Sequence, residues 1–153
     1  NKETLVNLKN KYDYCFYGGK GYLPILKGNL VKKKFSLVKK KEKIIIKSFY
    51  VNHGEITSTA YIIGKLAYIS DTNGIFEKDF FKLKNLKYLI IDCLKFNSHQ
   101  SHFNLEQAIN ISRRVKAKKT IFTNLHSDLD YNFLKKSLPR NMVPAYDGMI
   151  LNI

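Results

Sequence analysis

The sequence predicts a single α/β domain, and three observations carry that prediction. The chain has 153 residues, which is the length of one domain and enough to bury a core. Apolar residues make up 44% of it and aromatic residues 13%, as in globular proteins. From about residue 44 onward, short apolar segments alternate with segments of helical periodicity. That alternation is typical of α/β folds.

The first 43 residues differ in composition from the rest. Residues 3–11 have the apolar spacing of a short amphipathic helix, and 12–24 form an aromatic, glycine-rich stretch that predicts a loop. Residues 31–43 hold two lysine triplets around a short apolar segment. We expect a solvated hairpin or edge strand there, with a dedicated anion-binding strip as the alternative. The region 1–43 is therefore interpreted as a variable, basic and aromatic segment.

The motif-bearing part, residues 44–153, predicts six strand segments and three helices. The strands are expected at 44–51, 59–63, 66–69, 88–93 and 119–123 and within 142–153; the helices at 77–83, 104–116 and 131–138. The helix that starts near Asn104 has the clearest signal, because Asn104 can cap it and Gln107 occupies the capping-box position. The continuous apolar run before Cys93 predicts a strand that is buried on both faces.

Charge and cysteine content limit the classes of function. The formal net charge is +15, from 27 basic and 12 acidic residues. Such a balance fits an anionic partner or substrate, but only three basic residues are Arg, and the Lys, Asn, Ile, Tyr and Phe content also fits an AT-rich genome. Cys15 and Cys93 are too few for a disulfide framework, so a reducing cytoplasm is the expected compartment. The sequence shows no signal peptide or membrane-spanning run.

Four of the chain's polar residues follow or separate predicted strands and carry metal-binding chemistry. They are His53, Asp71, His102 and His126. Imidazole and carboxylate groups suit Zn²⁺ or Mn²⁺, and strand ends are where open α/β sheets gather active sites. His102 stands just before a predicted helix, where it could donate a proton to a leaving oxygen.

Each of these residues also has a purely structural interpretation. A lone histidine at a strand end is more often a surface or core residue than a ligand, and the Asp71 segment also fits an Asx-type turn. Asp128 and Asp130 follow His126, and either could cap the next helix. The combination of the histidines and Asp71 indicates a metal-dependent hydrolase more strongly than any one of them.

At this point the residues suggest a family. The chain resembles the metallo-β-lactamase-fold hydrolases, in the phosphoribosyl 1,2-cyclic phosphodiesterase-like branch. The resemblance lies in VNHGEITSTAYIIG (51–64), YISDTNGIFEKDFFKLKNLKYLIIDCL (68–94), SHFNLEQAI (101–109) and TNLHSDLDYNFLKKSLPRNMVPAYDGM (123–149). It implies a four-layer αβ/βα sandwich and two divalent metal ions, zinc or manganese.

The resemblance also implies a role for each site residue. His53 would bind one metal, Asp71 would bridge both, and His126 would bind the second. His102 would assist phosphodiester cleavage as an acid or a charge stabiliser. Many relatives have Thr-His-x-Ser-His-Asp where this chain has TNLHSDLD, so the ligand is expected to move from position 124 to His126.

One family feature is missing from the printed sequence. The hallmark His-x-His-x-Asp-His, which supplies four metal ligands, does not occur, because no two histidines are separated by a single residue. We therefore expect the chain to be the C-terminal portion of a longer domain, with partial or no metal occupancy and little activity alone. Such a portion would expose an apolar face and favour homodimerisation or aggregation.

Three functional hypotheses follow from the sequence. The first is a metal-dependent phosphodiesterase acting on a small phosphorylated substrate, such as a cyclic ribose phosphate or a nucleotide-like molecule. The second is a relative of the tRNA 3′-processing endonucleases, for which the lysine-rich residues 32–43 are the only candidate RNA-binding segment. The third is a metal-free basic module that binds nucleic acid. No membrane partner is expected, and no substrate-binding residue can be assigned.

Overall fold

The structure is a computed structural model, and it describes residues 1–39 and 42–153. Its centre is one seven-stranded sheet in which the strands follow chain order, β1 to β7. The strands are β1 (Lys34–Lys39), β2 (Glu42–His53), β3 (Ile56–Ile63), β4 (Leu66–Ile69), β5 (Tyr88–Asp92), β6 (Lys119–Thr123) and β7 (Met142–Pro144). Neighbours from β1 to β4 are antiparallel, and neighbours from β4 to β7 are parallel.

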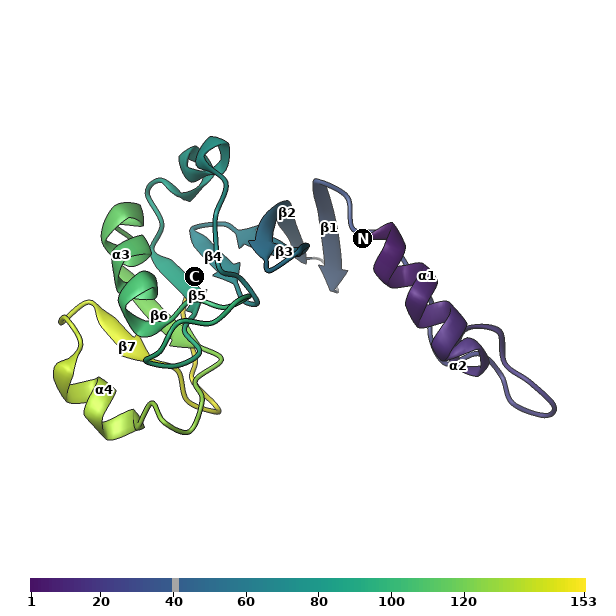
Figure 1. The fold of residues 1–153 in the computed structure, drawn as a ribbon. Coiled ribbons are helices and arrows are strands. Elements are labelled where there is room, and N and C mark those ends of the chain that lie inside the picture. The colour runs from purple at the N-terminus through teal and green to yellow at the C-terminus, as the bar shows by residue number, and fades with distance from the viewer. Residues whose placement is uncertain (40–41) are drawn as a thin grey trace.

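The helices outside the N-terminal segment pack on one face of this sheet. They are η1 (Glu77–Leu83), a 3₁₀ helix, and the α-helices α3 (Leu105–Val115) and α4 (Tyr131–Ser137), which lie beside β5 to β7 in Figure 1. Leu83, Ala108 and Leu134 from these helices join buried side chains of the strands in one hydrophobic core. Strands β4 to β6 are short and apolar, but β4 and β5 are fully buried only on their helix side. Leu89 and Ile91 of β5 are inaccessible, whereas Tyr68 of β4 is exposed on the other face, so the predicted burial of β5 on both faces is not complete.

The opposite face of the sheet carries no helix from η1, α3 or α4. Strand pairing places Leu37 beside Ile44 and Tyr61 beside Tyr68 on this side. Leu37, Ile44 and Tyr68 each keep more than a third of their surface exposed. This face of the sheet is therefore apolar and left partly in water.

The N-terminal segment forms an arm that extends away from the sheet (Figure 1). Helix α1 (Lys2–Lys11) matches the predicted helix, and Asn1 caps it. The predicted loop at 12–24 was partly wrong, because α2 (Asp13–Tyr17) forms a short helix before Gly18. The chain then returns along the arm, where Gly28 lies so close to Leu5 that a Cβ would approach Leu5 Cδ1 to 2.5 Å.

Most predicted elements agree with the structure, with shifted ends. The lysine-rich segment forms β1, an edge strand paired with β2, as expected; Lys40 and Lys41 of its second triplet lie outside the described residues. The terminal strand is much shorter than the predicted 142–153, because β7 ends at Pro144. None of the helices in the described part of the chain is long and apolar enough to cross a membrane.

Candidate metal centre

The sheet topology brings three of the predicted site residues to one edge. Strands β2, β4, β5 and β6 all run in the same direction, since β3 is antiparallel to both β2 and β4. Their carboxyl ends therefore meet at one edge, where open sheets bind ligands. His53 is the last residue of β2, and Asp71 lies two residues beyond the end of β4.

His53, Asp71 and His102 form a compact group of potential ligands. One ligand atom from each residue lies within 4.8 Å of the other two. The rings of His53 and His102 meet edge to face, with their centroids 4.8 Å apart. Two imidazoles and a carboxylate at this separation match the donor set that divalent zinc and related metals accept.

A close backbone approach holds His53 in the group. Gly54 has a φ of +63°, a conformation that glycine adopts easily, and a Cβ at Gly54 would lie 3.2 Å from Ser101 Cβ. The approach brings Ser101 O within 2.8 Å of His53 Nδ1. A carbonyl only accepts hydrogen bonds, so Nδ1 carries the proton and Nε2 keeps its lone pair. His53 is thus oriented as a metal ligand would be.

A buried carboxylate orients His102 in the same way. Asp92, the last residue of β5, is fully buried, and its Oδ2 lies 2.7 Å from His102 Nδ1. The same oxygen accepts a hydrogen bond from the Thr72 amide at 2.8 Å, and Oδ1 accepts one from Asn124 Nδ2 at 3.1 Å. Burial raises the pKa of Asp92, while the bonds from Thr72 and His102 act against that rise. His102 therefore presents Nε2 as its free nitrogen.

Asp71 and Asn124 have the unusual backbone that the site requires. Asp71 has a φ of +52° and Asn124 a φ of +61°, a region in which Asp and Asn are the best tolerated non-glycine residues. The Ser58 hydroxyl donates to Asp71 O at 2.7 Å and fixes the turn. Asn124 Nδ2 lies 3.4 Å from Asp71 Oδ1, so one amide faces both carboxylates of the site.

The third predicted metal ligand, His126, does not lie in this group; the third member of the group is His102, which was predicted to be catalytic. Its side chain is 58% exposed, and its Nδ1 lies 2.9 Å from Asp128 Oδ1. The backbone amide of His126 donates to Leu94 O at 2.8 Å, which ties the loop after β6 to the segment after β5. Asp130 caps α4 through Phe133 N, as expected of an aspartate in this loop. The role of His126 as a second-metal ligand stays a prediction.

His99, the remaining histidine, lies beside the site. Its ring centroid is 5.1 Å from that of His102. Partial desolvation is the largest cause that lowers the pKa of His99, and the neighbouring His102 and Lys95 lower it further. A neutral His99 adds no positive charge beside a metal.

Sequence reasoning missed two residues of the site. Asp92 was read only as the end of an apolar strand, although a carboxylate at the end of a buried strand is a signal in itself, because it needs partners inside the fold. From the sequence, Asn124 was considered only because many relatives have a histidine ligand at this position, which this chain replaces with His126. Its contacts with both carboxylates arise from folding and have no local sequence signal.

Comparison with known proteins agrees with this fold. No protein-family model matches the chain. A diphosphatase of the PhnP family has a structure with a TM-score of 0.84 and 26% identity, covering 97% of this chain and 54% of that one. YhfI of Bacillus subtilis, a metallo-β-lactamase fold protein, has a TM-score of 0.68 and 18% sequence identity, and the match covers 97% of this chain and 60% of YhfI. Human tRNase Z, short form (ELAC1), has a TM-score of 0.59 and 15% sequence identity, and the match covers 79% of this chain and 46% of that one.

The chain has the metallo-β-lactamase fold of the solved structures that it matches. Within that fold, the resemblance to the PhnP-family diphosphatase extends over nearly the whole of this chain. The chain spans about half the length of the solved structures that it matches.

A curated protein also matches the chain. The octanoyltransferase of Porphyromonas gingivalis (strain ATCC BAA-308 / W83) is 27% identical over 109 residues, which are 69% of this chain and 22% of that protein. Because the match covers so small a share of the octanoyltransferase, that name describes the longer protein and assigns no activity to this chain.

Proposed function

We propose that this chain is part of a metal-dependent hydrolase that cleaves phosphodiester bonds. The observation that carries the proposal is the group of His53, Asp71 and His102, whose ligand atoms lie within 4.8 Å of one another. In both histidines, Nδ1 has a carbonyl or carboxylate partner, which is the usual support of a metal-binding imidazole.

The donor set fits a divalent metal, zinc or manganese. His53 and Asp71 would hold it, and His126 would hold a second ion together with residues from the rest of the fold. When bound, such ions supply Lewis acidity that lowers the pKa of water and screens phosphate charge. The pairing of His126 with Asp128 supports the second role, because a carboxylate on Nδ1 leaves Nε2 free.

The side chain of His102 would act on the leaving oxygen. Its Nδ1 is held by the buried carboxylate of Asp92, so Nε2 is the atom that can deliver a proton to the departing alkoxide. The carboxylate of Asp92 would support the positive charge of a His102 ring that donates this proton, and the Thr72 amide keeps the carboxylate in place. The side chain of His102 is only 17% exposed, and this burial limits the access of water to the ring.

The remaining ligands would come from outside residues 1–153. The family's His-x-His-x-Asp-His does not occur in the printed sequence, and the solved relatives are about twice as long as the chain. We expect the missing half of the sandwich to cover the apolar sheet face and to bring these ligands to the same edge. Residues 1–153 alone would then have little or no hydrolytic activity.

The proposed substrate is a small phosphorylated molecule, such as a cyclic ribose phosphate or a nucleotide-like diester. The net charge of +15 favours an anionic substrate. One solved relative is called a diphosphatase and another a tRNase Z, so both small and macromolecular phosphate esters occur among proteins of this fold.

Hydrolysis of bis(p-nitrophenyl) phosphate by the complete protein, loaded with Mn²⁺ or Zn²⁺, tests the proposal. His102→Gln should reduce kcat/KM by about 100-fold or more, since removing an acid–base group costs roughly 10²–10⁴. Asp71→Asn should reduce it by at least as much, because it removes a carboxylate that would hold the metal. His99→Gln is the matched control and should change the rate less than threefold. Full activity in the Asp71→Asn variant, or turnover without any metal, would contradict the proposal.

A further inference from the structure

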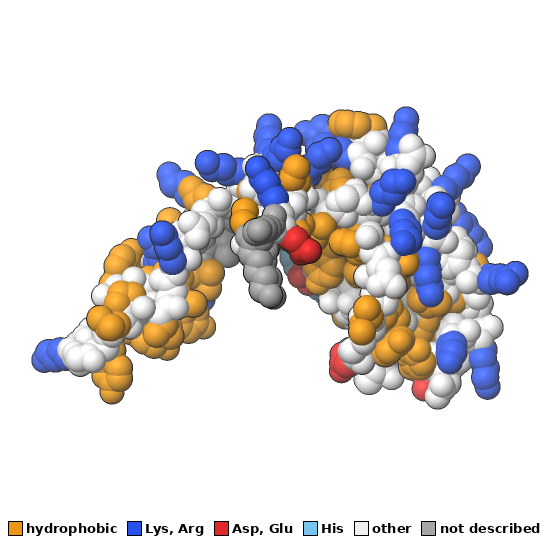
Figure 2. Space-filling view, turned by 180° about the vertical axis from the view of Figure 1, so that it is seen from behind, with side chains coloured by type: hydrophobic (Ala, Val, Ile, Leu, Met, Phe, Trp, Pro, Cys, Tyr) orange, Lys and Arg blue, Asp and Glu red, His pale blue; other side chains and the backbone are white. Residues whose placement is uncertain are grey.

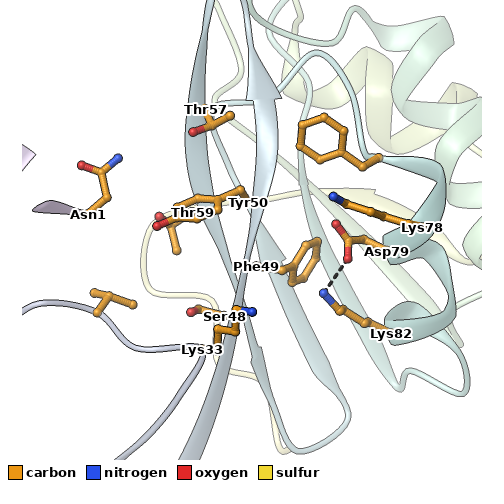
Figure 3. A pocket seen from close by; sticks show the side chains of 12 residues that line it. Asn1, Lys33, Ser48, Phe49, Tyr50, Thr57, Thr59, Lys78, Asp79 and Lys82 are labelled. Carbon is orange, nitrogen blue, oxygen red and sulfur yellow. Dashed lines mark hydrogen bonds and ion pairs between the residues drawn. The ribbon is translucent and has the colours of Figure 1, made fainter. Parts of the chain in front are cut away.

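Two adjoining cavities lie along strands β1 to β3 beside helix η1, and most of the lysines that line them are remote from the metal centre. Their volumes are about 510 and 610 Å³, and both are lined by Lys33, Ser48, Phe49 and Lys82. We call them together the basic groove, because seven lysines line it: Lys33, Lys34, Lys47, Lys65, Lys78, Lys82 and Lys84. Figure 3 shows the smaller cavity, with Lys78 and Lys82 projecting from η1 toward Phe49.

The positive charge of the basic groove is almost uncompensated. Asp79 is the only acidic residue in its lining; it is buried and pairs with Lys82. Within the described residues, none of the other six lysines forms an ion pair. Figure 2 shows blue side chains along the upper margin of the molecule, from the arm to the body, with few red ones. Like charges gathered in a concave surface attract a polyanion.

Aromatic rings lie among these lysines. Phe81 is 64% exposed on η1, and Lys82 Nζ lies 5.8 Å from its ring centroid. The same ammonium group lies 5.1 Å from the ring of Phe49 below it. Lys78 Nζ lies 5.5 Å from the ring of Phe76, which also lines the groove. An exposed ring between ammonium groups offers a base a surface to stack on while the lysines meet its phosphates.

We propose that the basic groove binds single-stranded nucleic acid. Lysines alone would suit any polyanion, but the exposed ring of Phe81 adds an interaction that only a chain carrying bases can use. A duplex hides the faces of its bases, so it could not stack on this ring. The structure thus favours an unpaired strand, with Lys34, Lys47 and Lys84 on its phosphates.

The basic groove is separate from the metal centre. Lys47 and His53 are six residues apart on β2, which corresponds to about 20 Å along an extended strand. Lys34 and Lys47 pair with each other on the η1 side of the sheet. Leu37 and Ile44 pair on the opposite, apolar side that another half of the fold would cover. Tyr50 and Thr59 of the smaller cavity lie on that opposite side, so the lysines replaced in the test below belong to the larger cavity. Binding in the groove therefore does not depend on the proposed hydrolase activity.

Fluorescence anisotropy with a labelled oligouridine of about 12 nucleotides tests the proposal. The triple variant K34Q/K47Q/K84Q should bind at least tenfold more weakly than the wild type. The slope of log K against log salt should become shallower by about 2, because each lost phosphate contact contributes about 0.7. The triple variant K118Q/K135Q/K136Q has the same net charge and removes exposed lysines elsewhere, so it should lose less than threefold.

A second pair of variants tests whether bases are read as well as phosphates. Phe81→Ala should weaken oligouridine binding at least fivefold, whereas Phe133→Ala, which removes a ring of similar exposure from α4, should leave it unchanged. Asp71→Asn should also leave it unchanged, whatever its effect on hydrolysis. Equal losses in the two lysine variants, or inorganic polyphosphate bound as tightly as oligouridine with no effect of Phe81→Ala, would overturn the proposal.

Discussion

Replacing Asp92 by Asn tests the buried pair that orients His102. The substitution keeps the shape of the side chain and removes its negative charge. Oδ2 accepts hydrogen bonds from the Thr72 amide and from His102 Nδ1, while Oδ1 accepts one from Asn124. The single side-chain oxygen of the introduced asparagine can still accept from Thr72 and His102. Its NH₂ group then faces the NH₂ group of Asn124, and since two donors cannot bond to each other, the Asn124 side chain must rotate by about 180°. Turning brings the Asn124 oxygen toward Asp71.

The expected loss of stability follows from these contacts. A hydrogen bond to a charged group contributes about 1.5–3 kcal/mol and a neutral one about 0.5–1.5 kcal/mol, so two weakened bonds cost about 2–3 kcal/mol. Removing the charge recovers part of its desolvation cost, which is evident in the raised pKa of Asp92. We expect a net destabilisation of about 1–2 kcal/mol, or a fall in Tm of roughly 3–6 °C for a chain of this size.

Urea unfolding followed by circular dichroism measures this effect. Asp128→Asn is the matched control, because Asp128 also pairs with a histidine Nδ1, but at an exposed position. It should change the free energy of unfolding by less than about 0.5 kcal/mol. Equal effects of the two substitutions would refute the reasoning, since they would mean that the burial of Asp92 and its three donors does not matter.

Two further predictions concern the scaffold around the site. Asn104→Ala removes the side-chain oxygen that accepts from Gln107 N at the start of α3 and should cost about 1 kcal/mol of stability in urea unfolding; a loss below about 0.3 kcal/mol would contradict the capping role. Burial raises the pKa of Cys93 to about 12. Because only the thiolate reacts with an alkylating reagent, Cys93 should be alkylated at pH 8 at least 100-fold more slowly in the folded protein than in urea. Peptide mass spectrometry resolves Cys93, and equally fast labelling in both states would contradict its burial.

The fold could be predicted from the sequence wherever the periodicity was long and clear. The helix capped by Asn104 and the strand at 66–69 came out at the predicted positions because their patterns are local. Helix α2 was missed, since five residues beside glycines leave too short a pattern to distinguish from a loop. The end of β7 was misplaced because the apolar residues Met149 to Leu151 were taken as a continuation of the strand, although Asp147-Gly148 before them is a turn signal and forms a turn.

The site could be predicted only in part, because its geometry depends on contacts between distant segments. His53, Asp71 and His102 were identified by residue type and position at strand ends, and the parallel directions of β2, β4 and β5 bring them together. Asp92 was missed, since its partner His102 lies ten residues further along, across a loop.

Anomalous X-ray diffraction from crystals of the complete protein, grown with Zn²⁺, tests the central claim most directly. The account predicts a zinc peak about 2.0–2.2 Å from His53 Nε2 and from an oxygen of Asp71. The same electron-density map shows whether His102 binds this ion. Zinc bound elsewhere, for example only between His126 and Asp128, with no density beside His53 and Asp71, would contradict it.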